Sequence, residues 1–466
     1  MAKELREFLT EIGKKYPSEL ASVEKEVNPA NFEVTAILQH LENQKRFPMV
    51  IFEKPLNGRG QPSGMRLLSN VFASRERCAI ALGLPPEKSR VEVGLAYAER
   101  ENTSIAPIVL MRKDSAVKEV VKAGKDVDLF EYPNVRHHEM DPAPYIDMTV
   151  VVKDPERHFY NISFQRTMVQ AKDQLGIFMS LRHNLFISRK YEEKKIPVPL
   201  IVVVGHHPAF CLGALNLLPF GVDDYHVLGG FMAEPLRLTP SESWGENFLV
   251  PADGEIILEG EMLPWEREAE APFGEFTGYY GPQRYGPVIK VRAITHRKDP
   301  IFQHTFVGHR DVSILGGIPK EGGLLNAIKG VVPSVKAVHF PPSGTCRFYA
   351  FISLKKTYEG APKQAALTAL AHCDFIKICV IVDEDIDVFN EEEVWWAVAT
   401  RSQPSEDFDI LRRVKGSVLD PSLIEEDTTS KLIIDATMPL SYPFASRLKV
   451  PDEAMERIRL EDFIEG

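Results

Sequence analysis

The first hundred residues combine helical periodicity with short apolar runs. Apolar residues recur every three to four positions over Leu5–Ile12 and Thr35–Leu41, which predicts two amphipathic helices. A short apolar run, Pro48–Phe52, follows them, and a polar, turn-rich stretch comes next. This mixture predicts an N-terminal α/β domain over residues 1–108.

The middle of the chain, residues 109–310, is rich in predicted strands. Its apolar runs are β-branched or alternate with polar residues, and they are bounded by Pro, Gly and Asp, which is typical of strands. Many short strands at this spacing predict a barrel or a sandwich. One helical pattern, from about Gln174 to Lys194, interrupts them. The predicted strands are Ile146–Val152, Leu200–Val204, Glu255–Glu261 and Val288–Thr295.

The last third, residues 311–466, alternates strands and helices, which predicts a C-terminal α/β domain. The segment 308–323 is interpreted as a long loop. The final pattern, Asp452–Phe463, predicts an amphipathic helix with no core to join, so we expect it to pack on a partner subunit. The other predicted elements are helices at Gly323–Gly330, after Pro362 and at Glu391–Thr400, and strands at Val335–Phe340, Phe348–Leu354 and Phe375–Val382.

Composition narrows the classes of protein. The 466 residues are 44% hydrophobic and 26% charged, which is ordinary for a globular protein. The net charge of −11 argues against a general nucleic-acid binder. The longest apolar stretch, Ile196–Gly205, is half the length of a bilayer span, so no membrane insertion is expected. Five scattered cysteines without a CxxC pair predict a reduced, cytoplasmic protein.

Several weak motifs favour structural roles. Gly58, Gly60 and Gly64 miss the dinucleotide-binding spacing by one residue and indicate a loop. The acidic run Asp383–Asp387 lacks the glycine of a calcium loop, so we interpret the acidic turn that continues to Asn390 as a cap for the next helix. The pairs His137-His138 and His206-His207 resemble ligands, but neighbours on a strand face opposite ways, which favours structural roles.

Three stretches carry candidate chemistry: Asn161–Arg166, Arg182-His183 and Glu270–Tyr280. Glu270 and Glu275 are separated by a turn that contains Pro and Gly, which would place both carboxylates in one crevice. Beside Arg166, two such acids can separate their pKa values, so that one keeps a proton to donate. From the residues alone, solvated surface charges remain the alternative.

These stretches, in this order, resemble the UbiD family of decarboxylases, which use prenylated FMN. The family patterns are N-x-G/S-x-x-R, a helix histidine about twenty residues later, E-x-P-F/Y-G-D/E-x-x-G-Y, and K-x-Y-x-G-x-x-K. The resemblance runs from Glu4 through the C-terminal region, and it implies a central split β-barrel that binds FMN. The matching residues are Asn161, Ser163, Arg166, His183, Glu270 to Tyr279, Lys356, Tyr358, Gly360 and Lys363.

The resemblance also implies a cofactor and a metal. Asn161, His183 and Asp224 would bind a divalent metal, usually Mn2+, and K+ is a further candidate ion. Asp224 stands where the family has glutamate, and Glu234 is the fallback. Lys363 would meet the flavin phosphate. The residues implied to contact the flavin are Asn161, Ile162, Ser163, Phe164, Gln165, Arg166, Arg182, His183, Asp224 and Lys363.

The implied reaction is reversible, non-oxidative decarboxylation of an aromatic, heteroaromatic or α,β-unsaturated acid, with release of CO2. Glu275 would donate the proton, Arg166 would hold the substrate carboxylate, and Glu270 would complete the network. Aryl and heteroaryl acids are the first expectation, and a polyprenyl hydroxybenzoate is the second. The alternatives are a metal-dependent hydrolase without flavin and a non-catalytic flavin-binding protein.

Two further expectations concern partners and the loop. A prenyl-flavin synthase would supply the cofactor, and the terminal helix predicts a homodimer or a multiple of it. His304, His309 and Arg310 would contact substrate or, as we favour, hydrogen-bond to the backbone of the loop.

Overall fold

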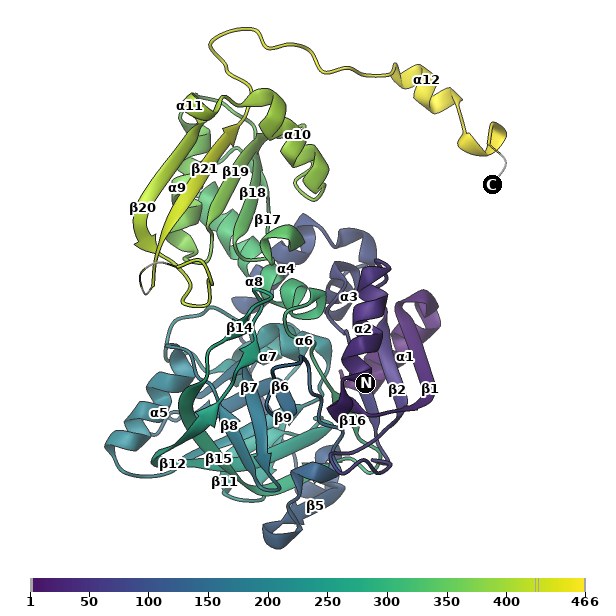
Figure 1. Cartoon of the computed structure of the whole chain (residues 1–466), viewed down its shortest axis with the longest axis vertical. Helices are drawn as coiled ribbons and strands as arrows, with labels where there is room; N and C mark the ends of the chain where they lie inside the picture. Colours follow the sequence, from purple (N-terminus) through teal and green to yellow (C-terminus); the bar gives the residue numbers. More distant parts are fainter. Residues whose placement is uncertain (1–2, 424, 426, 465–466) are drawn as a thin grey trace.

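The computed structural model describes residues 3–464 apart from 424 and 426. The chain folds into three domains (Figure 1). The N-terminal domain lies beside a barrel, the C-terminal domain lies at the other end of the molecule, and an extended arm leaves the C-terminal domain (Figure 1). Within the described ranges, no helix combines the length and apolar character needed to cross a membrane.

The N-terminal domain is a four-stranded sheet covered by helices. The predicted helix at Leu5–Ile12 is confirmed, and its apolar face is buried. The fourth strand, β16, comes from far along the chain and pairs with β3 in parallel, so the barrel segment adds a strand to this sheet. The elements are α1 (Leu5–Lys15), β1 (Leu20–Val27), α2 (Glu33–Asn43), β2 (Met49–Pro55), β3 (Arg66–Ser69), α3 (Arg75–Ala81), α4 (Val91–Glu101) and β16 (Ile301–Gln303).

The central domain is a closed six-stranded antiparallel barrel with one extra strand. The strand order is β12-β9-β6-β7-β8-β15, pairing of β12 with β15 closes the barrel, and β5 extends it beside β15. The four strands predicted here are confirmed. Their bounds are β5 (Val120–Ala123), β6 (Tyr145–Lys153), β7 (Tyr160–Ala171), β8 (Gln174–Ile177), β9 (Val198–Val204), β12 (Ile256–Glu270) and β15 (Arg284–His296).

The helix predicted from Gln174 to Lys194 is wrong in its first half. Gln174–Ile177 forms β8, and all four of its residues are buried between β7 and β15. Gly176 permits this packing, because a Cβ there would lie 2.7 Å from the side chain of Gln170. The helix α5 spans only His183–Glu193. Arg182 therefore caps the helix and His183 opens it.

Shorter elements connect the barrel to its neighbours. Helix α7 places Asp224 in its first turn, beside the start of β7. The strands β10, β11 and β4 form a small separate sheet. The elements are β4 (Ile108–Val109), α6 (Pro208–Gly213), α7 (Asp224–Met232), β10 (Arg237–Ser241), β11 (Gly245–Pro251), β13 (Phe273–Gly274) and β14 (Tyr280–Gly281).

The segment predicted as the loop 308–323 is a helix. Helix α8 spans Arg310–Lys329, and the helix predicted at Gly323–Gly330 is only its last part. Its glycines and Pro319 are typical of loops, but here they allow close packing. A Cβ on Gly322 would lie 1.9 Å from the carbonyl oxygen of Gly94 in α4, so only glycine permits this contact.

The C-terminal domain has the predicted α/β pattern, with strand order β17-β18-β19-β21-β20. Asp383 and Asp385 at the end of β19 pair with Arg401, whereas the side chain of Asn390 caps α10, so only the end of the predicted acidic cap performs that role. The elements are β17 (Val335–His339), β18 (Tyr349–Leu354), α9 (Ala361–His372), β19 (Ile378–Asp383), α10 (Glu391–Arg401), α11 (Pro404–Asp407), β20 (Phe408–Lys415) and β21 (Thr428–Ala436).

The terminal arm leaves the C-terminal domain after β21 and projects away from the body of the molecule (Figure 1). The helix predicted at Asp452–Phe463 is shorter than expected: α12 spans Asp452–Arg457, and a single 3-10 turn follows. None of the side chains of α12 is buried, and Leu448 is 98% exposed.

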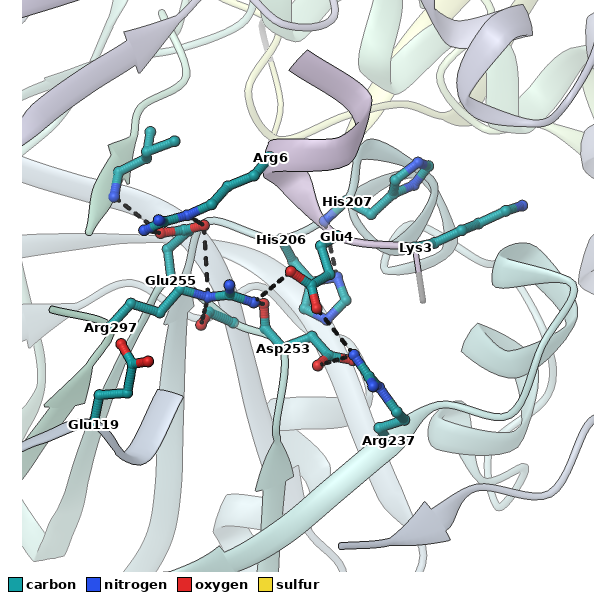
Figure 2. A network of polar contacts seen from close by, with 12 residues as sticks. Lys3, Glu4, Arg6, Glu119, His206, His207, Arg237, Asp253, Glu255 and Arg297 are labelled. Atoms are coloured by element: carbon teal, nitrogen blue, oxygen red, sulfur yellow. Dashed lines mark hydrogen bonds and ion pairs between the residues drawn. The ribbon is translucent and has the colours of Figure 1, made fainter. Parts of the chain in front are cut away.

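An ionic network fastens the start of α1 to the barrel, and Figure 2 shows it. Arg6 donates to both oxygens of Glu255 at 3.0 Å, and Glu4 accepts from Arg237 and Arg297, each at 3.0 Å. His206 and His207 lie next to this network and both are buried. His206 stacks on Phe210, and His207 accepts the N–H of Ala209, which agrees with the structural role favoured for this pair.

Candidate active site

Two neighbouring cavities lie where the barrel meets α8 and the C-terminal domain. The larger, about 510 Å³, is lined by the start of β7, by α5, α7 and α8, and by residues 372–375. The smaller, about 230 Å³, is lined by the middle of β7, by Glu275, by α8 and by Leu419. Leu215 lines both. Strand β7 therefore runs along both cavities.

The predicted arginine and acid cluster lies at the smaller cavity, which Arg166 and Glu275 line, whereas Glu270 is buried behind Arg166. Arg166 Nε donates to Glu270 Oε1 at 2.9 Å, and Nη2 donates to Glu270 Oε2 at 3.0 Å. Arg166 Nη1 donates to Glu275 Oε1. The Arg166 guanidinium also lies over the rings of Phe178 and Phe273, with its carbon 4.5 Å and 5.2 Å from their centroids. Sequence and structure agree that these charges share one crevice.

The two acids occupy different environments. Glu270 ends β12, is 0% exposed, and both of its oxygens accept hydrogen bonds from Arg166. Glu275 lies after the turn, and one of its oxygens accepts a hydrogen bond from Arg166. Burial raises the pKa of Glu275 and the charge of Glu270 raises it further, while Arg166 opposes both effects. Glu275 is thus the acid of the pair that is better suited to hold and release a proton.

Asn161, His183 and Asp224 line the larger cavity together. His183 Nδ1 lies 3.2 Å from Asn161 Oδ1. Asp224 is buried, and its oxygens accept from the backbone N–H of Ile162 at 2.7 Å and from Asn216 Nδ2 at 3.0 Å. Burial raises the pKa of Asp224 to about 7.

The donor set fits a divalent metal. Within the residues that the structure describes, no group of three His, Cys, Asp or Glu side chains gathers around one point. The candidate set instead combines an amide, an imidazole and a carboxylate, which are oxygen and nitrogen ligands that suit Mn2+. Each Asp224 oxygen accepts only one protein hydrogen bond, which leaves a lone pair on each. Glu234 accepts the N–H of Lys3 and does not line this cavity.

The flavin contacts predicted along β7 lie on the cavity walls. Ile162 and Ser163 line the larger cavity, and Phe164 and Gln165 line the smaller one. Gln165 Nε2 donates to Ser163 Oγ at 2.8 Å, which links the two parts of the strand. Arg182 is exposed and lines the larger cavity beside His183.

The structure does not bring Lys363 to either cavity. Its Nζ pairs with Asp409 at 2.8 Å, and its side chain is 55% exposed. Helix α9 directs its C-terminal end, His372 to Phe375, at the larger cavity, whereas Lys363 lies in its first turn. Lys320 of α8 lines the larger cavity instead. Burial and the nearby charges of Arg347 and Arg182 lower the pKa of Lys320 to about 8.

The histidines downstream of the barrel do not line either cavity. His304 Nδ1 lies 2.8 Å from Ser69 Oγ, and its Nε2 lies 2.9 Å from His137 Nε2. His309 stacks on Phe306, and its Nδ1 lies 3.0 Å from Glu42. Arg310 donates to the carbonyl of Ala73. The expected hydrogen bonds to the backbone of a loop at 308–323 are therefore wrong, because most of that segment is helix α8 and the partners described here lie on other elements.

Several charged cavity residues, Lys320 among them, were missed in the sequence. Asp147 faces Arg166 in the register of β6 and β7 and lines the smaller cavity, and burial raises its pKa well above the ordinary value. An acid inside the apolar run Ile146–Val152 was a usable signal. Glu101 ends α4 and lines the larger cavity, and Arg347 lines the smaller one. For these two, the sequence pattern offered no signal.

Comparisons with known proteins cover the whole chain. Domain models of 3-octaprenyl-4-hydroxybenzoate carboxy-lyase match in order: the N-terminal domain at residues 14–96, the Rift-related UbiD domain at 109–310 and the C-terminal domain at 313–436. The chain is 32% identical over 438 residues to anhydromevalonate phosphate decarboxylase of Methanothermobacter thermautotrophicus, covering 94% of this chain and 97% of that protein. It is 30% identical to phenolic acid decarboxylase of Bacillus subtilis, covering 94% and 93%.

Solved structures agree with these relatives. The UbiD-class enzyme HmfF of Pelotomaculum thermopropionicum, in complex with FMN, superposes with a TM-score of 0.91 at 33% identity and covers 99% of this chain and 100% of that one. Vanillic acid decarboxylase of Sedimentibacter hydroxybenzoicus, in its closed form, superposes with a TM-score of 0.82 at 30% identity, covering 100% of both chains. On these matches and the shared three-domain fold, the chain belongs to the UbiD family of carboxy-lyases.

Proposed function

We propose that this protein is a prenylated-FMN-dependent decarboxylase that reversibly removes CO2 from an aromatic, heteroaromatic or α,β-unsaturated carboxylic acid. The observation that carries the proposal is the cluster of Arg166, Glu270 and Glu275 at one cavity, next to a second cavity that is lined by Asn161, His183 and Asp224 and shares Leu215 with the first. The relatives support the reaction class, because they are named as decarboxylases and a neighbouring structure contains FMN.

The residues at the small cavity have different roles in the proposed reaction. Arg166 uses three of its five N–H groups on the two glutamates, so two remain to orient the substrate carboxylate. Glu275 donates a proton to the carbon that CO2 leaves. Phe178 and Phe273, which flank the guanidinium, limit the access of water. When bound, prenylated FMN supplies an acceptor for the electron pair that CO2 leaves behind.

The larger cavity would hold the phosphate end of the cofactor and a divalent metal, Mn2+ by preference and K+ as a further ion. Asn161, His183 and Asp224 would bind the metal. Lys320 takes the role that the sequence suggested for Lys363, because it supplies the buried positive charge beside these ligands. The strand from Asn161 to Arg166, together with Arg182, would contact the flavin.

Assembly and cofactor supply complete the proposal. The exposed arm with Leu448 and α12 would pack on a second copy and form a homodimer, since its apolar side chains have no cover within the described chain. A dimeric form of HmfF supports this. A prenyl-flavin synthase would provide the cofactor. All five cysteines are buried thiols, which favours the reducing cytoplasm.

One experiment tests the function. The protein is coexpressed with a prenyl-flavin synthase, its absorbance spectrum is recorded, and CO2 release is measured with aromatic, heteroaromatic and cinnamic acids. The proposal expects a bound flavin chromophore and CO2 release from at least one acid. Metal-dependent hydrolysis without a flavin chromophore would identify a hydrolase, and flavin without CO2 release from any of these acids would identify a carrier; either outcome would overturn the proposal.

A further inference from the structure

The small cavity contains a second arginine besides Arg166. Arg347 lies in the turn before β18 and lines the same cavity as Arg166 and Glu275. The other lining side chains are mostly apolar and include Phe164, Val312 and Leu419. In the proposed function Arg166 orients the carboxylate that leaves, so Arg347 has no role assigned there.

Arg347 has no acidic partner among the residues that the structure describes. Its Nη1 donates to the carbonyl of Thr345 at 3.2 Å, and its Nη2 to the carbonyl of Val312 at 3.4 Å. The guanidinium carbon lies 4.4 Å from the centroid of the Phe276 ring. Three of the five N–H groups therefore remain unused. Burial lowers the pKa of Arg347 to about 10, so the side chain stays protonated at neutral pH.

Helix α8 is built to admit this guanidinium. A Cβ on Gly316 would lie 1.8 Å from Arg347 Nη2, so a larger residue there would push the guanidinium out of its present position. The Arg347 guanidinium faces a largely apolar cavity and pairs with no acid among the described residues, which is unfavourable. An anion that binds in the cavity would offset this desolvation penalty. A guanidinium fork is well suited to carboxylate and phosphate oxygens.

We propose that Arg347 binds a second anionic group of the substrate, so that the preferred acid carries a carboxylate or phosphate in addition to the carboxylate that leaves. The inference rests on the proposed decarboxylase function. Arg347 lines the cavity of Glu275 and not the one lined by His183 and Asp224, which assigns it to the substrate and not to the cofactor phosphate.

The test compares acids of equal size and different charge. Cinnamic acids with a carboxylate, a carboxamide or a phosphate at the 3- or 4-position are assayed for CO2 release by the cofactor-loaded enzyme. Equilibrium binding is measured by calorimetry with loaded enzyme that also carries Glu275→Gln. We expect the carboxylate or the phosphate series to bind at least about tenfold tighter than the carboxamide, as one charge-assisted hydrogen bond would provide. The series with the larger preference identifies the group.

Variants then assign the preference to Arg347. Arg347→Gln should abolish the preference through KM, and Arg347→Lys should keep part of it. Gly316→Ala should weaken the preference with the charge retained, because the guanidinium of Arg347 must move aside. This variant serves as the test if Arg347→Gln does not fold. Leu419→Ala, on the same cavity, is the control and should change all acids by the same factor.

The outcomes separate this inference from the function. Equal kcat/KM for acid and carboxamide, unchanged in Arg347→Gln, would overturn the inference and leave the decarboxylase intact. If Arg347→Gln lowers kcat/KM for all acids by the same factor, or loses its flavin, the inference is also overturned. The absence of CO2 release from every acid would overturn the function itself.

Discussion

Glu270 holds Arg166 through both of its oxygens, at 2.9 Å and 3.0 Å, whereas Glu275 reaches the same guanidinium through one oxygen only. This asymmetry fixes the orientation of Arg166 and leaves one oxygen of Glu275 free of the arginine. Because the bidentate pair is the more rigid, we expect Glu270 to position Arg166 and Glu275 to donate the proton.

Glu275→Gln should retain the flavin spectrum and the metal but lose turnover. The amide has the same shape and cannot donate the proton, so kcat should fall by about 10² to 10⁴. CO2 release, absorbance and metal content measured on one preparation check this. Turnover near that of the wild type would contradict the assignment.

Glu270→Gln should reduce turnover by a different route. The amide NH2 would face the Arg166 donors, so the guanidinium would turn away and KM should rise along with the fall in kcat. Glu268 lies on the same strand, accepts a hydrogen bond from Gln174 and does not contact Arg166, so Glu268→Gln is the matched control and should behave as the wild type. Steady-state kinetics of both variants decide the point.

The turnover of the loaded enzyme should depend on pH through Glu275. Burial raises the pKa of Glu275, and the acid is useful only while it is protonated. In the decarboxylation direction, kcat should therefore fall as pH rises through that pKa and level off below it. The profile should be recorded where flavin content is constant. A kcat that increases with pH over this range would show that another group supplies the proton.

The cation that holds the cofactor should be Lys320 and not Lys363. Lys320→Met removes the charge that lines the larger cavity, so bound flavin should fall by about tenfold or more, as expected for a lost phosphate contact. Lys363→Met removes an exposed lysine paired with Asp409 and should leave flavin content unchanged. Flavin per protein, measured by absorbance after gel filtration, compares the two. The reverse result would restore the role inferred from the sequence.

Buried histidines should make the fold sensitive to acid. Burial lowers the pKa of His304 to about 3, below its ordinary value of 6.5. As pH falls below about 6.5, His304 binds a proton in the unfolded chain but not in the folded chain. The free energy of unfolding should therefore fall by about 1.4 kcal/mol per pH unit until about pH 3.

A His304→Gln variant isolates this effect. The wild type should have a higher free energy of unfolding than the variant. This difference should be largest above pH 6.5 and should become smaller as pH falls toward 4. Urea unfolding of both proteins at pH 7 and pH 5 gives the comparison. A difference that is the same at both pH values would show that folding does not lower the pKa of His304.

The sequence predicts a segment well when its local pattern determines its structure, and poorly when contacts with distant residues determine it. The barrel strands follow their own apolar patterns, and the acids Glu270 and Glu275 follow a turn whose chemistry is visible in the sequence. Helix α8 could not be predicted in this way, because its glycines are typical of a loop. Their reason, the close packing of Gly322 against Gly94, is visible only in the structure. The error on α8 also concealed Lys320.

Other residues needed the tertiary structure for a different reason. Gln174–Ile177 has a helical pattern but pairs with two strands, and that pairing outweighs the local preference. Arg347 becomes informative only when its neighbours are known, since an arginine without an acidic partner looks like any other in a sequence. Asp147 differs, because an acid in an apolar strand is visible beforehand.

The larger cavity draws its walls from β7, from α8 and from the segment that ends α9, and these parts are far apart in the chain. During synthesis Asn161 leaves the ribosome long before Phe375 exists. A fragment that ends before Phe375 therefore cannot capture a ligand that needs both walls, and loading must wait until this part of the C-terminal domain has been made. Whatever delivers the ligand must accordingly recognise a folded acceptor.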